Sequence, residues 1–488
     1  MLRDARGLGG LVLRNAVSSD LTEVAEPAAL HRLERYRARS MPTGSQREDG
    51  GQRLDQHSYL APDDAAATAV AISAAVQILT AESVPAAGQA ARWLTDRVTA
   101  TGRPLHPGGV ASLGDALSPG LQAALRCSLE EKVMPVARLR HRTAVASTRS
   151  PSNHDTRARM LPTALWPEWS LRLTPQHASG KPAARRADEL LTVACLLVGN
   201  TTAIRAATRL TGTTVSSHNV STLLADLTRR RDCADVLHAL ILLADHLDQH
   251  GSPIDYTRRR ALFTSRPCFI APKNWRDLQR CLRSNHTPDI AHAQRWIFHT
   301  LTGSPPGLAH PAIAPATQAQ RQQYKRFRWR ILPAEADLLT HTARTILDEH
   351  GIDEPVQWTP QLDAAILRGL RLPGPDPDSI TVAQLHQTVP GGAFSIAQVA
   401  QALNTTTAHA IHLLSRNPVD WSPPRFRRTQ HTATRIGQWR TWYEQDRLSL
   451  QDIADREGTS LATVRLALLK NDVPLRPAGS HPGRPRRR

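Results

Sequence analysis

The chain has 488 residues and a formal net charge of +18, with 61 lysine and arginine residues against 43 aspartate and glutamate residues. This length allows two to four domains, and the positive balance favours a polyanionic partner, either nucleic acid or an anionic membrane surface. Because no apolar run is long enough to span a bilayer, no signal peptide is evident and no two cysteines form a CxxC pair, we expect a cytoplasmic protein that does not insert into a membrane.

The pattern of apolar residues is helical along most of the chain. Aromatic residues make up only 4% of the sequence, and alanine, leucine, arginine, glutamine and glutamate recur at helical spacing. We therefore predict a mainly α protein with a multi-helical body. The motifs described below add two small three-helix helix-turn-helix domains after this body.

The first two thirds of the chain contain an N-terminal segment and the helical body. Residues 1–64 include one helical pattern and a polar, glycine-rich stretch, so we expect this segment to be partly disordered. Residues 65–302 form the predicted body, although a stretch broken by glycine and proline near 105–120 predicts a loop there. Another helical domain is expected over 315–371, after a proline-rich boundary, and RLPGPDPDS at 371–379 predicts a linker.

Within the body, residues 203–227 read as a helix, a glycine turn and a second helix. Ala207, Gly212 and Val220 occupy the positions of the small, turn and buried residues of a degenerate helix-turn-helix. The spacing from alanine to glycine is one residue longer than the motif requires. Two interpretations remain open, a unit that docks in DNA and a relative that only packs.

The segment near 324–329 interleaves aromatic and basic residues. Tyr324, Phe327 and Trp329 alternate with arginine and lysine, a pattern that can stack on nucleic-acid bases. An amphipathic helix with its aromatic side chains in the core explains the same pattern, and we favour that interpretation because large aromatic residues are usually buried.

A second helix-turn-helix pattern lies in residues 379–415. Ala400, Asn404 and Ala410 follow the spacing of the motif, and asparagine replaces the turn glycine because it tolerates the left-handed backbone conformation. Thr405 or Thr406 is expected to cap the second helix. That helix carries few basic residues, so the pattern predicts the fold more firmly than contact with DNA.

The third pattern, in the 433–475 domain, satisfies the motif at each position. Ser449 and Asp452 form a capping box, which predicts that a helix begins there. Ala454 is small enough for close helix packing and Gly458 suits the turn. Ser460 then caps a second helix whose inward residues are expected to be Val464, Leu468 and Leu469.

This segment resembles the helix-turn-helix of the resolvase/invertase and homeodomain-like DNA-binding families. The resemblance covers about a tenth of the chain, and it implies that the second helix enters the major groove of a duplex. Arg465 carries the forked donors that suit guanine. The DNA-binding residues that follow from the resemblance are Ser449, Thr459, Ser460, Leu461, Ala462, Arg465 and Leu466.

The tail, residues 476–488, is proline-rich and basic. From Trp421 to the C-terminus, 14 arginine and lysine residues stand against six acidic residues, an excess of eight. The GRP sequence at 483–485 resembles an AT-hook, in which an arginine-proline strand lies in the narrow minor groove. A disordered arginine tail held by general electrostatics is the alternative. The tail residues expected to contact DNA are Arg484, Arg486, Arg487 and Arg488.

Motifs for catalysis were not found. The chain contains no GxxxxGK[ST], no GxGxxG before a helix and no GxSxG. The Tyr36–Ser40 segment is similar to the nucleophile motif of serine recombinases, but Ala38 replaces its arginine and the preceding sequence is helical. His246 and His250 have the spacing of a zinc pair without a third ligand at a fixed distance. We predict no catalytic residue, no cofactor and no metal.

Together these patterns predict a sequence-specific protein for double-stranded DNA, associated with the nucleoid. Transcriptional regulation or an accessory role in a mobile element would follow, and a homodimer is compatible with the motif. Two alternatives stay open, a serine-recombinase-like DNA enzyme and a helical scaffold that binds proteins.

Overall fold

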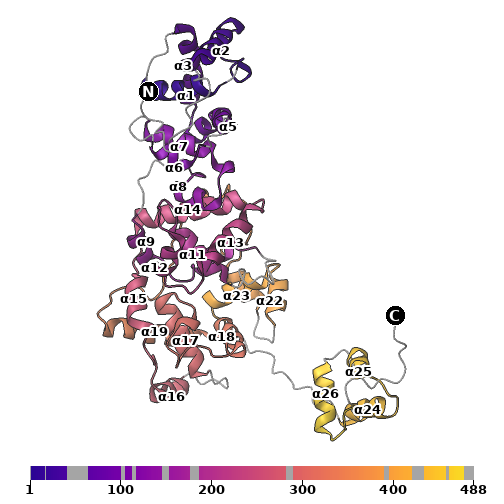
Figure 1. The fold of residues 1–488 in the computed structure, drawn as a ribbon. Helices are drawn as coiled ribbons and strands as arrows, with labels where there is room; N and C mark the ends of the chain where they lie inside the picture. Colours follow the sequence, from indigo (N-terminus) through magenta and orange to yellow (C-terminus); the bar gives the residue numbers. More distant parts are fainter. Residues whose placement is uncertain are drawn as a thin grey trace. The chain divides into compact units, whose positions relative to one another are not determined.

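The structure is a computed structural model, and its helices are drawn in Figure 1. It describes residues 2–16, 18–40, 64–100, 105–112, 117–145, 153–175, 186–281, 289–389, 395–419, 433–457 and 461–476. Within these ranges every regular element is a helix and none is a strand, which confirms the mainly α fold class. Of the helices in these ranges, none combines the length and the apolar character that crossing a membrane requires.

The chain divides into two compact units. Unit 1 comprises residues 1–388 and 396–419, and unit 2 comprises residues 389–395 and 420–488.

The N-terminal core of unit 1 is built around a helix rich in alanine. Ala67, Ala71 and Ala74 of α3 are buried, and such small side chains let α1 and α2 pack closely against α3. The sequence did not indicate α1, and the loop predicted near 105–120 contains the short helix α6. The elements are α1 (Leu2–Asn15), η1 (Ser18–Asp20), α2 (Pro27–Ser40), α3 (Ala65–Leu79), α4 (Val84–Ala90), α5 (Arg92–Ala100), α6 (Pro107–Ser112), α7 (Pro119–Ser128) and η2 (Glu130–Lys132).

The central part of unit 1 surrounds α11, whose side chains are buried along its whole length. Arg157 of α9 is buried in this part. Its guanidinium binds Asp248 on α14 and the carbonyl groups at the end of α11, so it joins these three helices. Trp166 and Trp169 are buried in the same core. The helices are α8 (Pro135–His141), α9 (His154–Met160), α10 (Pro167–Leu173), α11 (Ala187–Leu196), α12 (Ile204–Leu210), α13 (Ser217–Thr228) and α14 (Cys233–His250).

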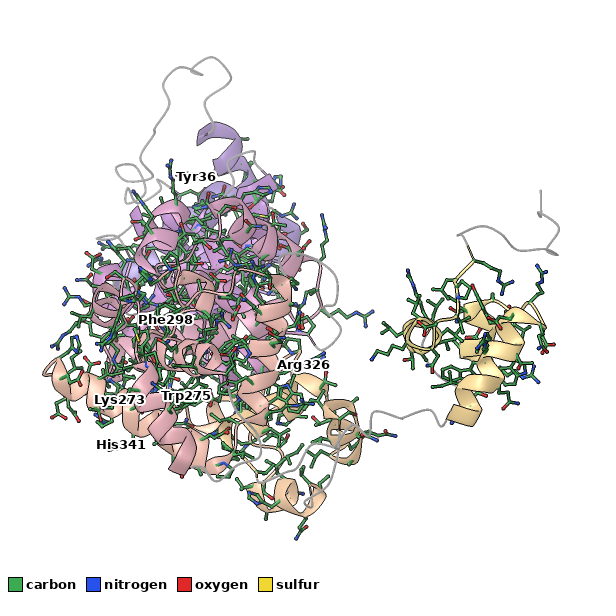
Figure 2. The ribbon with its side chains drawn as sticks, turned by 90° about the horizontal axis from the view of Figure 1, so that it is seen from below. Tyr36, Lys273, Trp275, Phe298, Arg326 and His341 are labelled. Carbon is green, nitrogen blue, oxygen red and sulfur yellow. The ribbon has the colours of Figure 1, made fainter. Side chains whose placement is uncertain are left out.

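A third core contains the aromatic residues of the basic segment near 324–329. Tyr324 and Phe327 lie in this core with Phe298, which Figure 2 labels, and Trp329 is buried as well. The core interpretation is therefore confirmed, and base stacking by these rings is wrong because they are not accessible. The elements are α15 (Tyr256–Phe263), α16 (Pro272–Cys281), α17 (Ile290–Thr302), η4 (Pro306–Leu308), α18 (Gln318–Arg330) and α19 (Pro333–Glu349).

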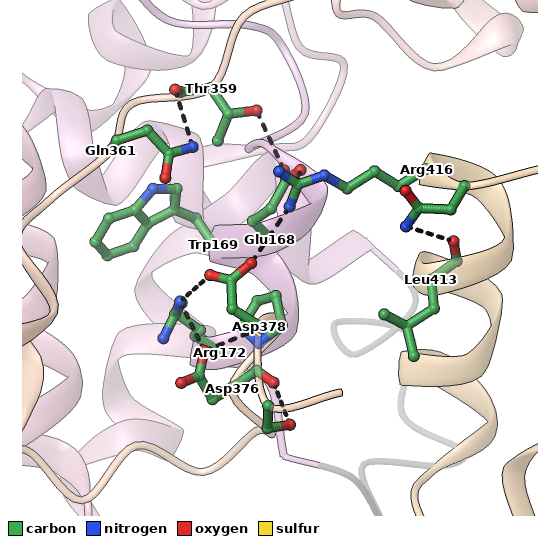
Figure 3. A network of polar contacts seen from close by, with 12 residues as sticks. Glu168, Trp169, Arg172, Thr359, Gln361, Asp376, Asp378, Leu413 and Arg416 are labelled. Carbon is green, nitrogen blue, oxygen red and sulfur yellow. Dashed lines mark hydrogen bonds and ion pairs between the residues drawn. The ribbon is translucent and has the colours of Figure 1, made fainter. Parts of the chain in front are cut away.

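The predicted linker at 371–379 packs against α10 instead of standing free. The Gly374 amide donates to the Arg172 carbonyl at 3.0 Å. The Arg172 guanidinium pairs with Asp376 at 2.8 Å and with Asp378 at 3.2 Å, as Figure 3 shows. The prolines of this segment exclude a helix. Its carboxylates pair with Arg172 of α10, and Gly374, which has no side chain, lets the backbone approach the end of α10 closely. We call residues 359–379 the strap.

The strap leads into the last helices of unit 1. Arg416 of α23 lies 3.8 Å from Glu168 of α10 and 3.5 Å from Asp378 of the strap. The His409 ring nitrogen Nε2 lies 3.2 Å from the Pro377 carbonyl. These contacts fasten α23 to the body. Helix α20 (Ala364–Leu367) lies within the strap, and the helices that follow it are α21 (Val382–Thr388), α22 (Ile396–Ala402) and α23 (Thr407–Arg416).

Unit 2 contains three described helices around one tryptophan. Trp439 of α24 is fully buried and shares a core with Tyr443, Ile453, Val464 and Leu468. Each helix contacts the other two, so the core is closed on all three sides. The helices are α24 (Ala433–Glu444), α25 (Leu450–Glu457) and α26 (Leu461–Lys470), drawn in yellow in Figure 1.

Candidate nucleic-acid interface

The start of α25 has the capping box that the sequence predicts. The Asp452 amide donates to the Ser449 hydroxyl at 3.0 Å, and the Ser449 amide donates to the Asp452 carboxylate at 3.1 Å. These reciprocal bonds satisfy amide groups that a helix start leaves unpaired. Ser449, expected to contact DNA, thus has a clear structural role at this helix end.

The inner face of α26 packs against α24 and α25. Val464 and Leu468 are fully buried, and Ala454 of α25 is buried opposite them. A small residue at position 454 lets the two helices approach closely, as the motif requires. The expectation that Leu469 points inward is wrong. Its side chain is 47% exposed, because residues 464 and 468 already fill the inward face and 469 lies about 100° further round the helix.

The outer face of α26 combines leucine with positive charge. Leu461 is 39% exposed and Leu466 is 58% exposed, and Arg465 is exposed beside them. Lys470 is exposed at the end of the helix. Within the described part of the chain, neither Arg465 nor Lys470 has an ion-pair partner. This face therefore offers two uncompensated cations and several apolar contacts.

Three carboxylates of unit 2 have partners within the unit. Glu457 pairs with Arg435 at 2.5 Å, and Glu444 pairs with Arg440 at 2.9 Å. Asp455 accepts a hydrogen bond from the Gln451 amide at 2.7 Å. The two ion pairs compensate the charges of Glu457 and Glu444 within the unit, and none of these three carboxylates pairs with Arg465 or Lys470 of α26.

Two arginines of unit 2 serve the fold. The Arg456 guanidinium lies 4.4 Å from the centre of the Trp442 ring, and that of Arg476 lies 4.2 Å from the centre of the Tyr443 ring. Arg476 also donates to the carbonyl groups of Tyr443 and Leu448. These contacts close the unit after α26, so neither arginine is as free as Arg465.

Several predicted DNA contacts lie outside the described residues. They are Thr459 and Ser460, the side chain of Ala462, and Arg484, Arg486, Arg487 and Arg488 of the tail. The turn residue Gly458 also lies outside the described residues. Of the predicted contacts that the structure describes, it brings Leu461, Arg465 and Leu466 together on one face of α26.

The second helix-turn-helix pattern has the expected local structure but a covered second helix. Asn404 has a φ of 47°, the left-handed conformation predicted for the turn. Thr406, and not Thr405, caps α23 by accepting a hydrogen bond from the His409 amide. Helix α23 contacts both α10 and α18, and its His409 and Leu413 are buried. A helix held in this way cannot enter a groove.

The degenerate pattern at 203–227 forms a true helix, turn and helix. Gly212 has a φ of 67°, and Ala207 and Val220 are fully buried, as the motif predicts. The Ser216 hydroxyl caps α13 by accepting from the Asn219 amide. The extra residue lengthens the turn and does not disturb the packing of either helix.

The residues considered for other chemistry do not assemble into a site. The rings of His246 and His250 lie 4.5 Å apart, and no group of three or more potential ligands that could hold a metal occurs among the residues with a described position. The Tyr36–Ser40 segment belongs to helix α2, whereas the recombinase motif follows a strand.

Comparisons of the chain with protein-family models, with curated proteins and with solved structures give no significant match.

Proposed function

We propose that unit 2 binds double-stranded DNA in a sequence-specific way, with α26 in the major groove. The resemblance to the resolvase/invertase and homeodomain-like helix-turn-helix families, seen at Ala454, Gly458 and Val464, supports this function. A role in transcriptional regulation or as an accessory factor of a mobile element follows from it, together with association with the nucleoid.

The observation that carries the proposal is the outer face of α26. Its inner face is occupied by the unit's own core, while Arg465 and Lys470 are exposed and unpaired within the described residues. An unpaired arginine on a helix that fits the groove can donate two hydrogen bonds to guanine. Leucine side chains beside it can contact thymine methyl groups, which are the apolar feature of that groove.

The test compares base readout with phosphate binding. Selection from random duplexes by the full-length protein should yield a defined motif. Arg465→Ala should weaken binding to that motif by roughly 5- to 150-fold, the equivalent of about 1–3 kcal/mol, and should relax the preference at one base pair. Binding to unrelated duplexes should change much less.

A matched control is available on α24. Arg440 is also exposed, but it pairs with Glu444 on its own helix. Arg440→Ala removes the same charge from unit 2 and should leave the selected motif unchanged. A selected motif that is identical for the wild type, Arg465→Ala and Arg440→Ala would contradict the proposal.

A protein partner is the second candidate for this face. Leu461, Leu466 and Leu469 are exposed on one helix, and such a group of large apolar residues is uncommon on a free surface. Substituting Leu466 and Leu469 by serine distinguishes the two functions. Retained DNA binding with loss of a protein complex would favour the helical scaffold, whereas loss of DNA binding would favour the groove.

A further inference from the structure

The turn between α12 and α13 in unit 1 is held rigidly by neighbouring elements. The Thr211 carbonyl accepts a hydrogen bond from the Thr163 hydroxyl at 2.9 Å. The Leu210 carbonyl accepts from the Arg260 guanidinium at 3.4 Å, and Val215 donates its amide to the Thr213 hydroxyl at 3.2 Å. A turn fixed at several points presents its two helices in one defined orientation.

Helix α13 has one buried face and one polar face. Its buried side chains, Val220, Leu224 and Leu227, recur every third or fourth residue and face the central core. The residues exposed on the opposite side are His218, Ser221, Ala225 and Arg229. Hydroxyl and imidazole groups can bind base edges or phosphates, and alanine permits a close approach of the helix.

Helix α12, which contacts α13, carries two positive charges on exposed side chains. Arg205 and Arg209 are exposed one helical turn apart, and the described residues provide no carboxylate that pairs with either of them. In a helix-turn-helix, the first of the two helices crosses the phosphate backbone while the second approaches the bases. The two arginines thus lie on the helix that would meet phosphates.

Two acidic side chains of α11 and α13, Glu189 and Asp226, have basic partners. Glu189 is buried and accepts a hydrogen bond from the Arg186 guanidinium at 2.6 Å. Asp226 lies 3.4 Å from the Arg229 guanidinium. Neither carboxylate presents a free negative charge that would repel a phosphate at α12.

We propose that the outer face of α12 and α13 is a second contact for duplex DNA, with Arg205 and Arg209 on phosphates and α13 toward the bases. This inference rests on the proposed function, because it adds a second region of contact to a protein that already binds duplex DNA through α26. Of the two interpretations of residues 203–227, it adopts the unit that docks in DNA.

The experiment measures the affinity of the full-length protein for its selected duplex at several salt concentrations. The double variant Arg205→Ala/Arg209→Ala should lower the slope of log K against log salt by about 1.8, since each phosphate contact contributes about 0.9. Between 50 and 200 mM salt, the wild type should therefore lose about 12-fold more affinity than the double variant. Arg205→Lys/Arg209→Lys should restore most of the slope, because lysine also neutralises phosphates.

A control separates the site from net charge. Arg3 and Arg6 of α1 are exposed as well, and Arg3→Ala/Arg6→Ala changes the net charge of unit 1 by the same amount. That variant should keep the slope of the wild type. In addition, His218→Ala/Ser221→Ala should alter the preferred bases in a part of the site that Arg465→Ala leaves unchanged.

The possible failures are distinguishable. If the wild type binds no duplex, the proposed function fails and this inference with it. If Arg465→Ala weakens binding while the α12 double variant retains the full salt slope, this inference alone is overturned. It is also overturned if the double variant loses affinity for single-stranded RNA or for an acidic protein but not for duplex DNA.

Discussion

Replacing Gly374 by alanine should release the strap from α10. A β-carbon at this position would lie 1.7 Å from the Leu171 carbonyl oxygen, 2.8 Å from its carbonyl carbon and 3.0 Å from the Thr174 oxygen. All three atoms belong to the backbone of α10 or its end and cannot rotate away. Normal contact requires the strap to withdraw by about 1.5 Å or more.

The cost follows from the contacts that this movement breaks. The hydrogen bond from the Gly374 amide to the Arg172 carbonyl contributes about 1 kcal/mol, and each ion pair of Arg172 with the exposed Asp376 and Asp378 contributes about 0–1 kcal/mol. Partly buried Leu370 and Leu372 also lose apolar contact with the central core. We expect a total of roughly 2–4 kcal/mol.

Limited trypsin digestion of the full-length protein measures the release directly. Arg368 and Arg371 lie in the strap, and an opening free energy lower by about 2 kcal/mol raises the cleavage rate there by about 30-fold. Gly369→Ala is the matched control, because its β-carbon would meet no atom within 4 Å. Equal cleavage rates and equal urea midpoints for the two variants would refute the reasoning.

Three further predictions concern other parts of the molecule. Asn404 has a φ of 47°, so Asn404→Val should lower the free energy of unfolding by about 1–2 kcal/mol in urea titrations. Asn404→Gly should be nearly neutral, because glycine adopts this conformation without strain. Equal effects of the two substitutions would argue against a backbone cause. Burial lowers the pKa of His299 and of His412 to about 4, below the value of 6.5 expected in the unfolded state. Between these two values the unfolded state binds more protons than the folded state. The free energy of unfolding should therefore fall as the pH drops from about 6.5 towards 4. The free energy of unfolding should fall by up to about 1.4 kcal/mol per pH unit for each histidine. His412→Gln should make the dependence of this free energy on pH shallower. An unchanged dependence would count against this cause. Deleting residues 484–488, whose structure is not described, should weaken binding to most duplexes and flatten the salt dependence, and unaltered affinity at low salt would exclude a DNA-binding arm.

Much of the local structure could be predicted from the sequence because local rules decide it. The Ser449–Asp452 capping box and the left-handed Asn404 and Gly212 depend on neighbours within one or two turns of helix. Hydrogen-bond geometry and side-chain size act over that range in any helical protein. The mainly α class followed from the same periodicity summed over the chain.

Which helix faces stay exposed was decided by the tertiary structure alone. Helices α23 and α26 follow the same residue spacing, yet α23 is covered by α10 and α18 while the outer face of α26 is open. The sequence could not reveal this difference, because the partners of α23 lie roughly 80 and 240 residues away from it. The strap shows the same limit, since the fit of Gly374 depends on α10 some 200 residues earlier. Periodicity determines which face of a helix is apolar, and only the packing of distant segments determines what is left for a partner to bind.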